Sequence, residues 1–369
     1  MIIMFEIEYE DEKSEARAGT LTVNNRIFET PGFLPVATKA DVKLISPDEL
    51  QEIGASGVIT NALVLFLRPG LEVVEAAGDI HKFMSWDGIV FSDSGGFQML
   101  NSDFLVKVTE ELVTFKSPFT GSILDFSPEL CVEIQMRLGS DIAMVLDDCP
   151  SYGSSYDDIL ASTKRTLFWA KRFRDSHKNQ SQEVFGIVQG GVFKDLRDNC
   201  AESLVKMDFD GYAIGGLCIG EPKDVMHEVI QKTTPLLPPQ KPRYLMGVGS
   251  PEDMLKAISC GVDIFDSVFP TRNARHNTVY TKNGKVNLGK EKFNSDIGPI
   301  DEGCKCYTCS KFSLSYVNHL LREYEYFGMR LATIHNLHFL VNLMKEAREA
   351  ILEGRFEGFK GEFLQNYKF

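Results

Sequence analysis

Acidic and amide side chains lie at the ends of several short apolar runs of this sequence. Asp93, Asp147 and Asp266 are placed in this way, and Gln189 is placed similarly at the end of a fourth run. Paired carboxylates suit reactions at an anomeric carbon, because one can act as a nucleophile while another handles protons. A single strand-end Asp is more often a helix cap. Three such residues on separate runs favour a catalytic site.

The residues around these side chains suit a flat heterocyclic ligand. Glutamine and aspartate side chains, with backbone N–H groups, match the donor and acceptor edge of a planar base. Glycines allow the backbone to approach such a ligand closely, and they occur in Gly215-Gly216-Leu217 and Met246-Gly247. Cys149 follows the Asp147 run. Phe97 could stack on a ring, although a lone Phe is usually a core residue.

A cysteine cluster near the C-terminus has the spacing of a metal site. Cys304, Cys306 and Cys309 are followed, after 25 intervening residues, by His335. Three thiolates and one imidazole close a tetrahedral zinc shell with no open position, which predicts a structural Zn²⁺. From spacing alone His319 and His338 remain alternatives for the fourth ligand.

The apolar runs alternate with amphipathic stretches of helical period, which predicts a parallel sheet with helical crossovers. There are eight such runs: Phe33–Ala37, Gly57–Thr60, Ile89–Asp93, Ile142–Asp148, Val184–Gly190, Tyr212–Gly216, Tyr244–Gly249 and Ile264–Phe269. An open doubly wound sheet shows the same alternation. The count of eight and the lack of a Gly-rich phosphate fingerprint after the first run favour an α/β fold of the (β/α)8 TIM-barrel type.

The chain divides by composition near residue 293. We expect a catalytic barrel over 1–292, with a hairpin at Phe5–Ile27 covering its bottom. We expect an inserted zinc-binding subdomain and a C-terminal barrel helix over 293–369. Helices are predicted within this part over Ser313–Tyr326 and Asn336–Leu352.

Composition excludes several classes of protein. The chain has 369 residues, 43% hydrophobic and 25% charged, which is typical of a globular protein. Its apolar runs are shorter than the roughly 18 residues of a membrane span. The N-terminus lacks the pattern of a signal peptide, so we expect a cytoplasmic protein with reduced thiols. A net charge of −13 argues against non-specific nucleic-acid binding, yet residues 267–292 carry a local charge of +5.

Taken together, these motifs resemble the bacterial-type queuine tRNA-ribosyltransferases, also called tRNA-guanine transglycosylases. The resemblance runs from Pro35-Val36-Ala37-Thr38 to Ile334-His335-Asn336-Leu337. Its most specific segments are Asp93–Gln98, Gly186–Gly191 and Phe265-Asp266 with Pro270-Thr271-Arg272, together with the cysteine cluster. The family is a zinc-containing (β/α)8 barrel that exchanges the wobble guanine of tRNAs with a GUN anticodon for a 7-deazaguanine base.

The resemblance implies a role for each matching residue. Asp266 would be the nucleophile and Asp93 the general acid/base. The substrate-binding positions would be Asn61, Phe97, Asp147, Cys149, Gln189, Gly215, Gly216, Leu217, Met246 and Gly247. Arg272 and Arg275 would contact tRNA, and His335 would complete the structural zinc site. A homodimer without a membrane segment is expected, with Phe312, Tyr316 and His319 at the contact.

The residues around the implied base pocket bear on which base is exchanged. A branched Ile219 with Cys149 opposite predicts a small pocket, which favours 7-aminomethyl-7-deazaguanine (preQ1) over the bulkier queuine. Exchange of queuine is the alternative, as is a deazapurine transglycosylase acting on another nucleic acid. A non-catalytic tRNA-binding partner subunit is disfavoured because both aspartates are kept. A zinc hydrolase would need an open metal position at the barrel mouth.

Overall fold

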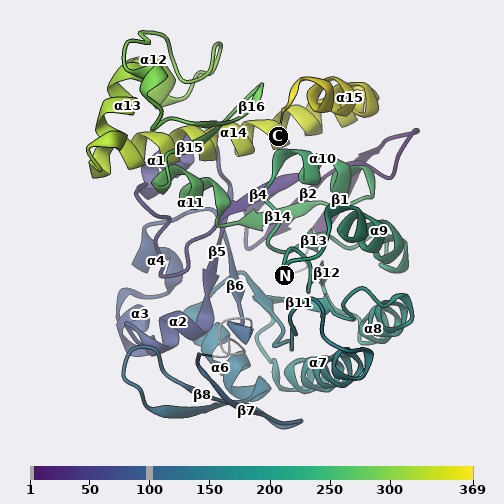
Figure 1. Ribbon diagram of the computed structural model, residues 1–369. Helices are drawn as coiled ribbons and strands as arrows, with labels where there is room; N and C mark the ends of the chain where they lie inside the picture. The colour runs from purple at the N-terminus through teal and green to yellow at the C-terminus, as the bar shows by residue number, and fades with distance from the viewer. Residues whose placement is uncertain (1–3, 97–102, 369) are drawn as a thin grey trace.

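Eight parallel strands form a closed barrel at the centre of the molecule (Figure 1). The computed structural model describes residues 4–96 and 103–368. In spatial order the barrel strands are β4 (Gly32–Pro35), β14 (Ile264–Ser267), β13 (Arg243–Leu245), β12 (Gly211–Ile214), β11 (Glu183–Val188), β10 (Ile142–Met144), β6 (Ile89–Asp93) and β5 (Gly57–Asn61). The last gap closes where Ala37 N donates to Ile59 O at 2.7 Å. The predicted TIM barrel is confirmed, and each predicted run overlaps one barrel strand.

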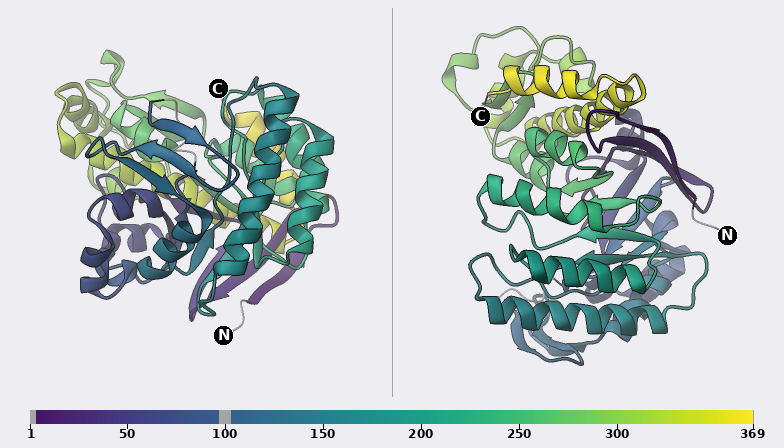
Figure 2. Two further views of the ribbon diagram at one scale, coloured as in Figure 1. Left: turned by 90° about the horizontal axis from the view of Figure 1, so that it is seen from below. Right: turned by 90° about the vertical axis from the view of Figure 1, so that its right-hand side faces the viewer.

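Helices surround the barrel and bury its strands on their outer face. These are α1 (Pro47–Ile53), α2 (Ala62–Leu67), α3 (Leu71–Ala77), α4 (Ile80–Met84), α6 (Pro128–Leu138), α7 (Tyr156–Ser176), α8 (Lys194–Lys206), α9 (Lys223–Thr233) and α10 (Pro251–Ser259). Figure 2 shows α7 to α10 side by side along one flank. Every residue of β5, β12 and β13 is buried. Burial on both faces explains why these strands read as continuous apolar runs.

Serine–proline pairs fix where several helices begin. Ser46, Ser127 and Ser250 precede α1, α6 and α10, and each side chain accepts a hydrogen bond from the backbone N–H three residues later. The following proline suits the first helical position because that position needs no N–H partner. Each helix therefore starts at a defined point after its strand.

A three-stranded antiparallel sheet precedes the barrel. Its strands are β1 (Met4–Glu10), β2 (Arg17–Val23) and β3 (Arg26–Thr30). The expected hairpin over Phe5–Ile27 is therefore extended by a third strand. Asn24 and Asn25 both adopt positive φ, at 51° and 63°, which is the conformation that a two-residue hairpin turn requires.

The C-terminal part carries a second apolar cluster of its own. The elements of this C-terminal part are α11 (Phe269–Arg275), β15 (Thr278–Thr281), β16 (Gly284–Asn287), η2 (Glu291–Phe293), α12 (Tyr307–Lys311), α13 (Leu314–Arg322), α14 (Tyr326–Leu352) and α15 (Phe356–Asn366). α14 contributes buried residues to both this cluster and the barrel core. It begins ten residues before the predicted Asn336, and α13 ends at Arg322 rather than Tyr326. The domain division at residue 292 stays a prediction.

The remaining elements are a short 3-10 helix and a small sheet. The helix η1 (Thr234–Leu236) follows α9, and the antiparallel strands β7 (Leu105–Val108), β8 (Val113–Lys116) and β9 (Ile123–Phe126) lie between β6 and α6 in sequence. Among the described residues, no helix combines the length and apolar character needed to cross a lipid bilayer.

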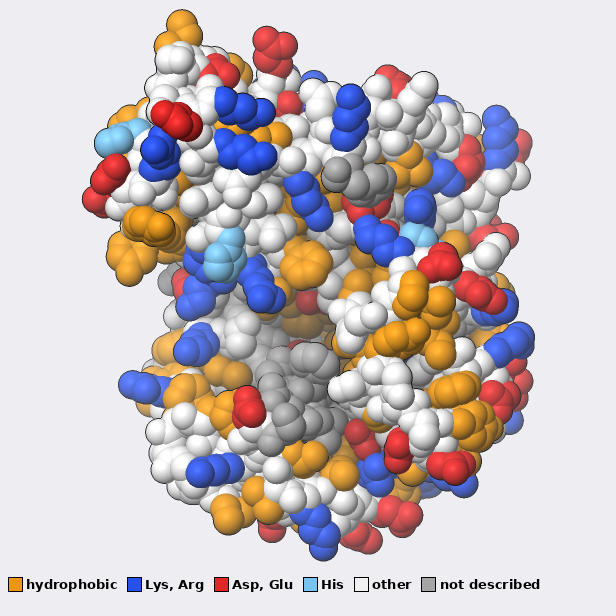
Figure 3. Space-filling view, in the orientation of Figure 1, with side chains coloured by type: hydrophobic (Ala, Val, Ile, Leu, Met, Phe, Trp, Pro, Cys, Tyr) orange, Lys and Arg blue, Asp and Glu red, His pale blue; other side chains and the backbone are white. Residues whose placement is uncertain are grey.

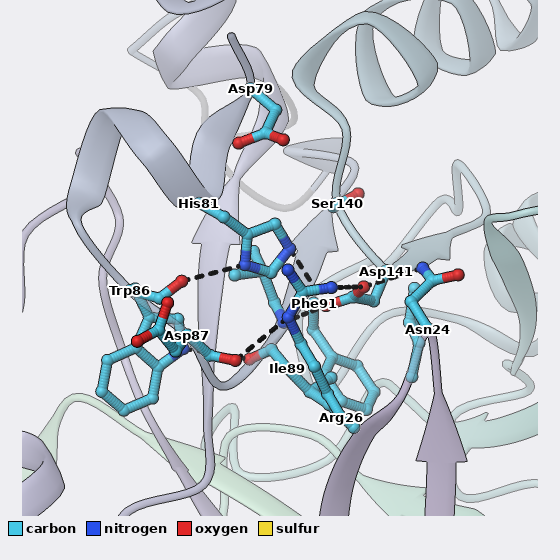
Figure 4. Close-up of polar contacts among 12 residues, drawn as sticks. Asn24, Arg26, Asp79, His81, Trp86, Asp87, Ile89, Phe91, Ser140 and Asp141 are labelled. Atoms are coloured by element: carbon cyan, nitrogen blue, oxygen red, sulfur yellow. Dashed lines mark hydrogen bonds and ion pairs between the residues drawn. The ribbon is translucent and has the colours of Figure 1, made fainter. Parts of the chain in front are cut away.

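A buried carboxylate joins the N-terminal sheet to the barrel (Figure 4). Asp141 precedes β10 and is 1% exposed. It accepts hydrogen bonds from Asn24 Nδ2 at 2.9 Å, Arg26 Nη1 at 3.0 Å and Val90 N at 2.9 Å. His81 Nε2 lies 3.1 Å from Oδ2, the oxygen that Val90 N also contacts. Burial opposes ionisation, but the contacts with His81 and Asn24 lower the pKa of Asp141. Residues at the N-terminal end of a TIM barrel typically serve stability.

Replacing Asp141 by Asn should therefore destabilise the fold. Removing one partner of a buried charged network costs about 3–5 kcal/mol. Because the folded pKa is depressed, the contribution is present above the pKa of unfolded Asp and is lost as pH falls. Urea unfolding of Asp141→Asn should show the large loss at pH 7 and a smaller one near pH 3. An exposed control, Asp41→Asn, should change little. Equal losses for the two variants at pH 7 would contradict this role for Asp141.

Candidate active site at the barrel mouth

The predicted site residues converge on one cavity at the C-terminal ends of the strands. The cavity has a volume of about 390 Å³. Of the residues predicted to act at the site, those lining it are Asn61, Asp93, Asp147, Cys149, Gln189, Gly215, Gly216, Leu217, Met246, Gly247, Asp266 and Arg272. Figure 3 views the molecule toward a hollow in the face of the barrel. Phe97 lies outside the described residues, and Arg275 lies one helical turn beyond Arg272.

Asp93 ends β6 and faces two other carboxylates. Asn61 Nδ2 donates to its Oδ2 at 3.0 Å, and Gly95 N donates to the same oxygen at 3.2 Å. Burial, together with the charges of Asp147 and Asp266, raises the pKa of Asp93 to about 7. A carboxyl group with such a pKa can both donate and accept a proton near neutral pH.

Asp147 and Gln189 form a joined pair across neighbouring strands. Gln189 Nε2 donates to Asp147 Oδ2 at 2.7 Å, and both residues are at least nine-tenths buried. Burial raises the pKa of Asp147 to about 6. The next residue, Asp148, does not line the cavity and instead pairs with Arg165 Nε at 2.7 Å. The pair can thus present a fixed set of donors and acceptors to a ligand.

Asp266 lies at the end of β14 and is held by a residue that sequence reasoning missed. The hydroxyl group of Tyr244 donates to Asp266 Oδ1 at 2.5 Å, and Gly247 N donates to the same atom at 2.8 Å. Burial raises the pKa of Asp266, while these two bonds lower it. A tyrosine within an otherwise apolar run needs a partner for its hydroxyl, and this was the signal that could have found it.

A second missed residue, Arg197 of α8, braces the loops that follow β11 and β12. It is 2% exposed, and its guanidinium donates to the carbonyl oxygens of Val188 and Gly215 at 2.8 Å each. Its Nε also donates to Gly191 O at 2.8 Å. Burial lowers the pKa of Arg197 to about 10. Charged residues are common on helices, so no feature of the sequence marks this one as pointing inward.

The glycines at the end of β12 make room for Gln189. A Cβ atom on Gly215 would lie 2.7 Å from Gln189 Nε2, and one on Gly216 would lie 2.4 Å from Gln189 Oε1. Gly216 also has a φ of +67°, which disfavours other residues. The glycines therefore make room for the Gln189 side chain, and their approach to a ligand stays a prediction.

The next residues of this loop are held by a carboxylate. Cys218 N donates to Glu221 Oε1 at 2.5 Å, and Ile219 N donates to Oε2 at 3.0 Å. Ile219 lines both the main cavity and a neighbouring cavity of about 220 Å³. Cys149 lines the same cavity, and burial raises the pKa of its thiol to about 12, so the thiol is neutral and a poor nucleophile.

The cysteine cluster is assembled as its spacing predicts. The ligand atoms of Cys304, Cys306, Cys309 and His335 all lie within 4.8 Å of one another. The Sγ atoms of the three cysteines lie 3.8, 3.6 and 3.3 Å from His335 Nδ1. A tetrahedral zinc ion would space sulfur and nitrogen ligands about 3.6 Å apart. The cluster can therefore hold a metal ion.

The surroundings of His335 select the nitrogen that could bind a metal. His335 Nε2 lies 2.6 Å from the carbonyl oxygen of Tyr280 and must donate to it, which leaves Nδ1 free as a ligand. His338 Nδ1 lies 3.8 Å from Cys304 Sγ, and the cluster geometry does not include it. None of the four cluster residues lines the cavity with Asp266. A metal bound here would not reach the barrel mouth.

The fold and this mouth define a (β/α)8 barrel with a cavity lined by three carboxylates and a separate Cys3His cluster. The sequence profile of the family described as Queuine tRNA-ribosyltransferase matches residues 11–369. Three proteins named "Queuine tRNA-ribosyltransferase" are similar over nearly their full lengths. The protein of Caldanaerobacter subterraneus subsp. tengcongensis is 50% identical, covering 99% of this chain and 98% of its own. That of Pelotomaculum thermopropionicum is 47% identical, covering all of both. That of Listeria welshimeri is 48% identical, covering 100% and 97%. The chain belongs to the queuine tRNA-ribosyltransferase family, and it is a glycosyltransferase by that membership.

The crowding of carboxylates should cost stability once Asp93 ionises. A group whose folded pKa is raised stabilises the fold below its unfolded pKa and loses that contribution as pH rises through the folded pKa. The advantage in melting temperature of Asp93→Asn over the unchanged protein should therefore grow between about pH 4 and pH 7. The control Asp224→Asn, at an exposed site, should show no such trend. A difference in melting temperature between Asp93→Asn and the unchanged protein that stays constant across this pH range would contradict the raised pKa of Asp93.

Proposed function

We propose that this protein is a tRNA-guanine transglycosylase that replaces the wobble guanine of GUN-anticodon tRNAs by preQ1. The observation that carries the proposal is the convergence of Asp93, Asp147 and Asp266 on one cavity in a member of this family. The named relatives are ribosyltransferases acting on tRNA. Within this family, the cavity supplies a carboxylate for the ribose and a separate polar set for the base.

The reaction would proceed by two displacements at the ribose anomeric carbon. In the first, a carboxylate oxygen of Asp266 bonds to C1′ while the C1′–N9 bond of guanine breaks, and Asp93 provides the proton that the leaving base needs. In the second, N9 of the incoming base bonds to C1′, the ester bond to Asp266 breaks, and Asp93 takes up the N9 proton. The pKa of about 7 at Asp93 suits both transfers.

The hydrogen bonds at Asp266 favour a nucleophile that is ionised. Tyr244 and Gly247 both donate to Oδ1, and these bonds offset part of the rise that burial causes in the pKa of Asp266. The two donors share Oδ1, so the other oxygen, Oδ2, would be the attacking atom. Exclusion of water from the mouth would protect the covalent ribosyl ester from hydrolysis.

The other cavity residues would select the base and the RNA. Asp147 and Gln189 would bind the polar edge of the base, with the backbone at Gly216 and Leu217, and Met246 would cover one face of the ring. Phe97 is expected on the other face. Arg272 lines the mouth and Arg275 lies near it, and the pKa of Arg275 is lowered by burial and by Arg272. Both would contact the anticodon loop.

Three further assignments complete the proposal. The Cys3His cluster would hold one structural Zn²⁺ per subunit, because its donor set and spacing fit that ion. A homodimer would form through the aromatic surface where Phe312 stacks on Tyr316. His319 is exposed on the same helix as Tyr316. A tRNA substrate and reduced thiols favour a cytoplasmic location.

Base exchange on a GUN-anticodon transcript tests the proposed function directly. The tRNA is loaded with radiolabelled guanine and then chased with preQ1 or with queuine. We expect preQ1 to release the label and queuine to fail, and Asp266→Ala to abolish loading. If no label enters the tRNA, the proposed reaction is wrong, and exchange on DNA or a non-catalytic role would be favoured instead.

Shortening Ile219 should change the accepted base. Because this side chain lies between the two cavities, Ile219→Gly should join them and admit the larger ring system of queuine. We expect queuine to release label from tRNA loaded by Ile219→Gly, with guanine exchange retained. Ile219→Val, which keeps a branched side chain, is the matched control. Release by queuine from the unchanged protein would contradict the small-pocket interpretation.

Removing a metal ligand should release the ion and loosen the subdomain. Cys306→Ser should lose bound zinc by elemental analysis and should melt at a lower temperature, because binding of a structural ion contributes to folding. Cys260→Ser, which changes a cysteine outside the cluster, should keep the metal. Full zinc content in Cys306→Ser would count against the assignment.

A further inference from the structure

A cationic cluster lies beside the barrel mouth, outside the residues assigned to the site. Lys39 Nζ lies 5.7 Å from the centroid of the Phe119 ring, and Arg68 Cζ lies 5.9 Å from the same centroid. Both distances fall within the roughly 6 Å at which a cation interacts with an aromatic face. One ring therefore orients two positive charges that come from different segments of the chain.

These residues come from three separate segments of the chain, two of which border the cavity. Lys39 follows Thr38, which lines the cavity after β4. Arg68 ends α2, whose N-cap Asn61 also lines the cavity, and a six-residue helix is about 9 Å long. Phe119 lies in the turn between β8 and β9. The cluster therefore lies on the rim, one short helix away from Asp93 and Asn61.

The two cations are available for a ligand. Both side chains are exposed, and neither forms an ion pair with a carboxylate within residues 4–96 and 103–368. The chain as a whole has a net charge of −13, whereas this cluster is locally positive. In Figure 3, Lys and Arg side chains gather along the left margin of the hollow. An anion near these exposed cations would be attracted by both charges.

We propose that Lys39 and Arg68, oriented by Phe119, bind the phosphate backbone of the substrate tRNA beside the nucleotide in the active site. This inference rests on the proposed function for the identity of the RNA. Arg can bind a phosphate through two parallel hydrogen bonds, and Lys adds a mobile point charge. Contacts with phosphates position an RNA without reading its sequence. The cluster thus adds affinity and register, while base identity is read inside the cavity.

Salt-dependent binding distinguishes this role from a solvated surface. Kd for a GUN-anticodon tRNA is measured by fluorescence anisotropy at several KCl concentrations. The double variant Lys39→Ala/Arg68→Ala should bind about tenfold more weakly, and its slope of log K against log salt should fall by roughly one for each phosphate that it no longer binds. Lys256→Ala, at an exposed position on α10, should match the unchanged protein. An unchanged Kd and slope in the double variant would overturn the proposal.

Two further variants test how the cluster works. Phe119→Leu keeps an apolar side chain but removes the aromatic face, so it should weaken binding about threefold. The double variant should lose the same factor on a tRNA with a changed anticodon, since phosphate contacts carry no sequence information. A loss confined to the GUN tRNA would overturn the phosphate assignment.

Guanine exchange by the unchanged protein is measured on the same preparations. If the protein exchanges guanine but the double variant binds tRNA normally, only this inference fails. If the unchanged protein shows no exchange, the proposed function fails, while an altered salt slope would still support the phosphate contacts. Failure of the phosphate-binding inference is therefore distinguishable from failure of the proposed function.

Discussion

The crowding of three carboxylates in one cavity is the constraint around which the barrel mouth is built. Asp93, Asp147 and Asp266 share one cavity, and burial raises the pKa of all three. In water such groups would simply ionise. Here each has different hydrogen-bond donors, so their proton affinities are separated. Pairs of titratable groups with divergent environments are how a protein assigns acid, base and nucleophile roles.

The scaffold meets this constraint through residues other than the three carboxylates themselves. Tyr244 and Gly247 stabilise charge on Asp266, while Asn61 and Gly95 hold one oxygen of Asp93. Arg197 secures the loops that carry Gln189 and the glycines. The parallel strands bring these residues to the C-terminal end of the barrel. The cost of holding charges together is thus offset by a rigid set of donors around them.

Much of the fold was accessible from the sequence because its signals are local and periodic. Eight apolar runs, each buried on both faces, predicted the eight barrel strands, and the cysteine spacing predicted the Cys3His cluster. The third N-terminal strand was missed because its signal, the Asn24-Asn25 turn, is only two residues long. Element ends were also misplaced, as at α14, whose early turns pack in the second apolar cluster.

The contacts that tune the site could not be predicted in the same way. Tyr244 and Asp266 are 22 residues apart, and Arg197 reaches carbonyl groups on two strands. The pair of cations at Phe119 joins three segments that are unrelated in sequence. Such contacts depend on tertiary packing, whereas the type and order of the strand-end residues do not. The sequence therefore predicted which strand-end residues come together, and the structure shows which hydrogen-bond partners set their pKa values.

Covalent capture of the ribosyl intermediate tests the proposed mechanism most directly. The protein is mixed with a GUN-anticodon tRNA, quenched with acid during turnover and digested, and the peptide that carries a nucleotide is identified by mass spectrometry. We expect an RNA-linked peptide containing Asp266, which is absent in Asp266→Asn. An adduct on another residue, or guanine exchange with no adduct, would contradict the role given to Asp266.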